Sequence, residues 1–186
     1  MRILEQRALR GPNMWSRFPT AYMKIDLEAF ADRPTDTFPG FTDLLMNSLP
    51  SLYEHRCGVG HVGGFQSRMI EGTWLGHVVE HVAIELQCLA GMEVGFGKTR
   101  ETSVPGVYHV VDRYRDERAG IEAGLQAFRI VEAATRMESL DIEPILQGLR
   151  EIREESMLGP STASIVEEAA GRDIPFLRLN EASLVQ

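Results

Sequence analysis

Cysteine is scarce in this sequence: Cys57 and Cys88 are the two present, and their spacing forms no Cys-x-x-Cys pair. This count excludes a disulfide-rich secreted scaffold, and Cys88 falls within an apolar run, so we expect reduced thiols. Apolar runs of about 18 residues, the length that spans a bilayer, do not occur. The first residues also lack the apolar core of a signal peptide. Together these absences predict a soluble, cytoplasmic protein with no membrane partner.

Positive charge is also in short supply. The chain has 19 Lys and Arg residues against 27 Asp and Glu residues, a formal net charge of −8. This balance argues against nucleic acid as a partner and leaves a cationic partner open. The glycine-rich stretch GVGHVGGF (58–65) lacks the Lys-Ser/Thr pair of a phosphate-binding loop. We therefore expect no nucleotide-phosphate site of that kind in these residues.

The pattern of apolar residues predicts an α+β fold, with helices packed on a mostly antiparallel sheet. The 186 residues suit one domain, residues 1–158, followed by a separate segment, 159–186. The glycine-rich segment 56–72 is expected to be a flexible loop, and residues 58–65 within it are expected to act as a lid over a functional site. Strands are predicted at 2–10 and 21–30 and as a hairpin within 92–114. Helices are predicted at 41–55 with a break at Pro50, at 73–90 with Thr73 as N-cap, at 116–137 with Asp116 as N-cap, and at 141–158.

Residues 76–87, GHVVEHVAIELQ, place two histidines and two glutamates inside an apolar run. At about 3.6 residues per turn, His77, Glu80, His81 and Glu85 share one sector of a helix. Valine, alanine and leucine side chains cover most of the remaining circumference, which is typical of a buried helix. Because an unpaired charge is costly to bury, each of the four groups needs a partner or a metal ion.

The spacing His-x-x-Glu-His is the inverted form of the zinc protease helix. Histidines at positions i and i+4 can bind one Zn²⁺ at about 2.0–2.1 Å per nitrogen. Glu80 then stands beside His81, where a carboxylate takes a proton from water activated by the metal. The alternative is that His77 and His81 are core histidines, hydrogen-bonded to the two glutamates and to backbone carbonyls.

A catalytic zinc site requires a third protein ligand. Glu85, one turn beyond His81, either binds the metal or orients a histidine from behind it. A carboxylate from the helix 116–137 would approach from another direction, and Glu117 is the first choice, ahead of Glu122 and Glu132. Each of these three also fits an exposed position on a solvated helix.

Other polar residues give weaker signals. His55 precedes the glycine-rich segment and His61 lies within it, and both are expected to be ordinary polar residues rather than ligands. Lys98 and Arg100 lie beside a predicted strand, where they either hold a carboxylate or form a solvated edge.

Several blocks of the chain resemble the N-terminal region of cyanophycin synthetases, and the resemblance covers nearly the whole sequence. Members of that family are longer and continue into an ATP-grasp ligase module and a Mur-ligase-like module. These modules add aspartate and arginine alternately to a poly-aspartate backbone with arginine side groups. The similar blocks are LRGPNMWS (9–16), LPSLYEHRC (49–57), EGTWLGHVVEHVAIELQCLAGMEVGFGKTRET (71–102), PGVYHVV (105–111) and LGPSTASIVEEAAGRDIP (158–175).

The resemblance implies an accessory domain that holds the growing polymer. In some members this domain is similar to half of an inverted-zincin metallohydrolase unit and makes primers by cutting polymer. Carried over, His77, Glu80 and His81 fall on the zinc motif, with Glu117 as the ligand from the following helix. The competing expectation is a polymer-tethering domain with a degenerate or structural metal site.

The resemblance also implies the partners of the chain. They are the arginine-bearing polymer, drawn to acidic residues such as those of helix 116–137, and the ligase modules of the same full-length chain. ATP and Mg²⁺ belong to those modules, which residues 159–186 would join as a linker and the start of the ATP-grasp part. The full-length protein is expected to be a homo-oligomer.

Overall fold

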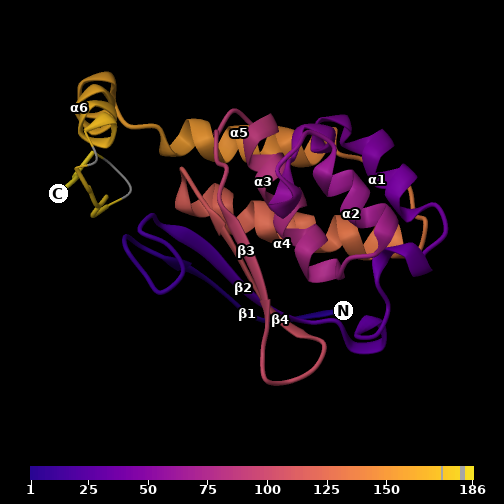
Figure 1. Cartoon of the computed structure of the whole chain (residues 1–186). Coiled ribbons are helices and arrows are strands. Elements are labelled where there is room, and N and C mark those ends of the chain that lie inside the picture. The colour runs from indigo at the N-terminus through magenta and orange to yellow at the C-terminus, as the bar shows by residue number, and fades with distance from the viewer. Residues whose placement is uncertain (173, 181–182) are drawn as a thin grey trace.

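The computed structural model describes residues 1–172, 174–180 and 183–186. Four strands form one antiparallel sheet in the order β1-β2-β4-β3. Figure 1 shows the helices α1–α5 on one face of this sheet, so the predicted α+β arrangement is confirmed. The strands are β1 (Arg2–Leu9), β2 (Thr20–Asp26), β3 (Gly97–Glu101) and β4 (Val107–Arg113). The helices are α1 (Phe41–Ser48), α2 (Gly64–Glu71), α3 (Leu75–Leu89), α4 (Glu117–Thr135), α5 (Glu143–Ser156) and α6 (Pro160–Gly171).

Helix α3 forms the centre of the core. It packs against β3 and β4 on one side and against α4 on another. Val79 and Leu86 have no exposed surface, as predicted. Gly76 allows the close approach to the sheet, because a Cβ there would meet the Tyr108 side chain at 3.2 Å. The helix ends before Gly91, whose φ of 83° lies in the left-handed region that commonly terminates a helix.

The prediction of a flexible loop over 56–72 is wrong from Gly64 onward, where α2 begins. Phe65 and Met69 lie one turn apart and are both fully buried, so tertiary packing stabilises this helix. A Cβ on Gly64 would lie 2.3 Å from the Arg56 carbonyl oxygen. The glycine therefore marks a close crossing of two backbone segments. Two short 3₁₀ turns, η3 (Pro50–Glu54) and η4 (Cys57–Val59), lead into it.

Replacing Gly64 by Ala should lower the free energy of unfolding by about 1–3 kcal/mol, the usual cost of forcing extra volume into a packed region. Gly58→Ala is the matched control, since a Cβ at Gly58 meets no atom within 4 Å. Urea unfolding of both variants measures the difference. Equal unfolding midpoints would show that the crossing at Arg56 is not tight.

The predicted N-cap residue is confirmed for α4 but not for α3. Asp116 caps α4, since its Oδ1 accepts from the Ala119 backbone N–H at 2.9 Å. The prediction that Thr73 caps α3 is wrong, because the N-cap position is Trp74 and no side chain caps the helix. Thr73 lies one residue too early for that role and is held instead by backbone and hydroxyl hydrogen bonds to Thr35.

The segment after α5 extends away from the helices that cover the sheet. Helix α6 stands apart from the other helices in Figure 1. The apolar run IPFLRL (174–179) favours a strand by its sequence, but the structure has only one bridge there, between Arg178 and Val185. Among the described residues, no helix combines the length and the apolar character needed to cross a bilayer.

Candidate metal centre

The polar sector of α3 is buried, as the sequence predicts. Its side chains face two different parts of the structure, strand β3 and the segment from η3 to the start of α2. Glu80, His81 and Glu85 are buried, and His77 is half-buried. Glu80 faces strand β3, where its Oε2 accepts a hydrogen bond from Thr99 Oγ1 at 2.5 Å. The other three side chains contact the segment that runs from η3 to the start of α2.

Cys57, His77 and His81 form the centre of the site. Each offers one ligand atom, and these three atoms lie within 4.8 Å of one another. The Sγ atom of Cys57 is 3.3 Å from Nε2 of His77. Cys57 has a φ of 50°, in the left-handed region that non-glycine residues seldom adopt. Such backbone outliers concentrate at functional sites, where surrounding contacts enforce them.

Both imidazoles are held in place through Nδ1. His77 Nδ1 is 3.0 Å from the Thr73 hydroxyl. His81 Nδ1 is 2.8 Å from Nδ1 of His55. The His81 ring also stacks on Phe65 with its centroid 4.0 Å away and an interplanar angle of 19°. Metal-binding histidines commonly have this second contact at the nitrogen that does not face the metal.

Burial sets the charge of these groups. Desolvation lowers the pKa of His77 to about 4 and that of His81 to about 2. Both imidazoles are therefore neutral at pH 7, the form that binds a metal ion. Desolvation raises the pKa of Glu80 to about 7, against an opposing contribution from the Thr99 hydrogen bond.

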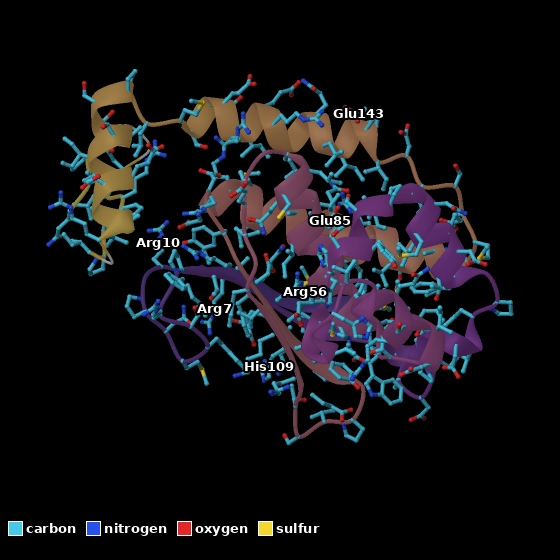
Figure 2. All side chains as sticks on the ribbon, turned by 45° about the horizontal axis from the view of Figure 1, so that its top comes forward. Arg7, Arg10, Arg56, Glu85, His109 and Glu143 are labelled. Carbon is cyan, nitrogen blue, oxygen red and sulfur yellow. The ribbon has the colours of Figure 1, made fainter. Side chains whose placement is uncertain are left out.

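Glu85 lies behind the two histidines and contacts neither of them directly by a hydrogen bond. Its Oε2 is 2.8 Å from His55 Nε2, and its Oε1 accepts a hydrogen bond from the Ser51 hydroxyl. Glu85 is buried, and in Figure 2 it lies among the helices. Glu85 thus contacts His55, which lies between it and His81.

The structure does not bring Glu117 to His77 and His81. Both Glu117 oxygens accept hydrogen bonds from Arg10, at 2.6 and 2.7 Å. Arg10 lies toward the side of the molecule away from α1 and α2 in Figure 2. Glu117 is distant because α4 runs antiparallel to α3, so that the start of α4 lies near the end of α3. Gln87, near the end of α3, donates a hydrogen bond to the carbonyl of Arg113, four residues before α4 begins.

The other carboxylates proposed on α4 are engaged elsewhere too. Glu122 accepts from the Gln126 amide at 2.6 Å, and Glu132 accepts from the N-terminal amine of Met1 at 2.9 Å. Glu117 remains paired with Arg10, which lowers its pKa. The third donor beside the two histidines is therefore the sulfur of Cys57.

Lys98 and Arg100 alternate with Thr99 along β3, so they point away from the face that meets Glu80. Lys98 is half-buried and Arg100 is exposed. His61 is exposed, and its Nδ1 lies 2.8 Å from the carbonyl oxygen of its neighbour Val62. These three residues take no part in the group around Cys57.

The donor set fits a zinc ion. One thiolate sulfur and two neutral imidazole nitrogens are ligands that Zn²⁺ prefers, and three protein ligands leave a fourth tetrahedral position. From the sequence alone, Cys57 indicated only the redox environment, and His55 was expected to be an ordinary polar residue. The signal that points to them is the run His55-Arg56-Cys57, which places two ligand-type side chains just before the glycine-rich turn.

Comparisons with known proteins agree on one relationship. A family model described as the cyanophycin synthase-like N-terminal domain matches residues 22–136. The chain is 50% identical to the cyanophycin synthetase of Synechocystis sp. strain PCC 6803 over 191 residues. It is 47% identical to the cyanophycin synthetases of Crocosphaera subtropica and Trichormus variabilis. Each alignment covers 100% of this chain but 22%, 22% and 21% of the relative, so the chain spans about a fifth of their length.

Proposed function

The chain belongs to the cyanophycin synthase-like N-terminal domain family, and on this basis we propose that it binds cyanophycin and cuts it slowly as a zinc-dependent endopeptidase. The observation that supports this most is the grouping of Cys57, His77 and His81 within 4.8 Å. Cleaved polymer would serve as primer for the ligase modules of the full-length protein.

Cys57, His77 and His81 would bind the zinc, and Glu80 would act as the general base for the attacking water. When bound, zinc acts as a Lewis acid on a peptide carbonyl and lowers the pKa of a coordinated water. The Glu80 carboxylate would accept a proton from the attacking water and return it to the leaving amine. The Thr99 hydroxyl fixes this carboxylate against β3.

Strand β3 offers a place for an extended substrate. It is the outermost strand on the side of the sheet next to Glu80. An edge strand presents backbone N–H and C=O groups that can pair with another extended chain. A poly-aspartate backbone has the peptide groups for such pairing, and the net charge of −8 favours its arginine side groups.

A tethering domain with a structural zinc is the second candidate. It is favoured by the position of the Glu80 carboxylate, which bonds to Thr99 and is not in the group formed by Cys57, His77 and His81. Cysteine ligands are also frequent in structural zinc sites. In that case the domain would hold polymer near the ligase modules and raise its effective concentration there.

The deciding experiment incubates the purified domain with polymer in the absence of ATP and follows chain length over time. We expect the polymer to shorten when zinc is supplied, to stop shortening with a chelator, and to resume when zinc is restored. Polymer that binds but keeps its length with every divalent metal tested would favour the tether.

The domain organisation follows from the same relationship. We propose that residues 1–158 form the polymer-processing domain and that 159–186 lead into the ATP-grasp module of a full-length chain, where ATP and Mg²⁺ would act. The separation of α6 from the helices on the sheet supports this division.

A further inference from the structure

His55 links the metal centre to a buried carboxylate. Its ring lies between Glu85 and His81, with Nε2 2.8 Å from Glu85 Oε2 and Nδ1 2.8 Å from His81 Nδ1. The backbone of His55 is fixed at both ends of a turn: its N–H donates to Leu52, and its carbonyl accepts from Phe65. The side chain of His55 is 14% exposed and that of Glu85 4%. The contact is therefore an interior one with little freedom.

When His55 is neutral, the hydrogen-bond roles along Glu85, His55 and His81 follow from the carboxylate. An ionised Glu85 only accepts, so Ser51 donates to one oxygen and His55 Nε2–H donates to the other. A neutral imidazole that carries its proton on Nε2 has a lone pair on Nδ1. That lone pair needs a donor, and the atom that faces it is Nδ1 of His81. His81 then carries its proton on Nδ1 and its lone pair on Nε2.

We propose that His55 is a positioning residue of the metal centre, which transmits the orientation set by Glu85 to His81 so that His81 offers Nε2 to the metal. The metal part of this inference rests on the proposed function, whereas the tautomer of His81 does not. His77 is arranged in the same way, since Thr73 holds its Nδ1 and its Nε2 faces Cys57 Sγ. Both ligand histidines would thus bind through the same ring atom.

Packing alone would not produce this effect. The stack on Phe65 fixes the plane of the His81 ring, but a flat apolar neighbour does not distinguish one ring nitrogen from the other. The proton of a neutral imidazole is placed by the hydrogen-bonding partners of its two nitrogens, and the partner at His81 Nδ1 is His55. Loss of His55 should therefore change the tautomer of His81 while the stack remains.

The test compares wild type with His55→Ala and His55→Asn. Two-bond ¹H–¹⁵N spectra of histidine-labelled, metal-free domain report the tautomer, and competition with a chelating dye reports the affinity for Zn²⁺. Wild type should show His81 protonated on Nδ1. His55→Ala should lose that preference and weaken zinc binding by about 10–100-fold, the usual effect of removing such a partner.

His55→Asn should restore much of both properties, because its Oδ1 takes the place of the accepting Nδ1. His61→Ala is the matched control, since that exposed ring contacts only the carbonyl of Val62 among the described hydrogen bonds. If His55→Ala fails to fold, the Asn variant and the wild-type spectrum still decide the matter.

Two results would overturn the positioning role. One is a wild-type His81 protonated on Nε2, and the other is unchanged zinc affinity and tautomer in a folded His55→Ala domain. If the tautomer follows His55 in a domain that binds no zinc, the positioning of His81 by His55 stands and the proposed metal function fails.

Discussion

Replacing Glu80 by Gln should slow polymer cleavage by about 100- to 10,000-fold, the usual loss when a general base is removed. Glutamine keeps the size of the side chain, and its amide oxygen can still accept from Thr99 Oγ1. It cannot accept a proton from water. Zinc content and the free energy of unfolding should stay close to those of wild type, because the donors Cys57, His77 and His81 are unchanged.

The measurement follows the length of the polymer without ATP, at saturating zinc, for wild type, Glu80→Gln and a control variant. Glu143→Gln is a suitable control, since Glu143 is an exposed residue of α5 paired with Arg150 and lies away from the site in Figure 2. If Glu80→Gln shortens the polymer as fast as wild type, Glu80 is not the base and the peptidase proposal fails.

Replacing Cys57 by Ala should weaken zinc binding by more than about 100-fold, since even outer partners of a metal site contribute about 10–100-fold. A ligand that binds only the folded state stabilises it by about 2.7 kcal/mol at 100 times its Kd. Zinc should therefore raise the melting temperature of wild type and have little effect on Cys57→Ala. Calorimetric titration with Zn²⁺ and thermal unfolding with and without zinc measure the two effects.

Two further variants make this test specific. Cys88→Ala removes the other thiol, which donates to the Val94 carbonyl, and should leave zinc affinity unchanged. Glu117→Gln removes the ligand that sequence reasoning preferred and should also leave it unchanged, since Arg10 holds that carboxylate. If Glu117→Gln lost zinc and Cys57→Ala retained it, the third zinc ligand would be Glu117 and not Cys57.

The sequence by itself determined the polar sector of α3 and the burial of the rest of that helix. Val79 and Leu86 are fully buried, and Glu80, His81 and Glu85 are buried with them. This was predictable because both properties depend on residues within a few turns of each other, and the helical repeat fixes which of them share a face. The antiparallel hairpin of β3 and β4 was predictable for the same local reason.

Only the tertiary structure decided which residues complete the site. Cys57 and His55 lie 20 and 26 positions before the histidines that they contact, in the segment that connects α1 to α2. There a glycine such as Gly64 signals a close backbone crossing, although its sequence context equally suggests a flexible loop. The sequence correctly predicted that Glu117 lies at the start of a helix. Because α4 runs antiparallel to α3, that start lies near the end of α3, away from His77 and His81. Contacts between distant segments depend on how whole elements pack, and a local pattern of residues does not contain that information.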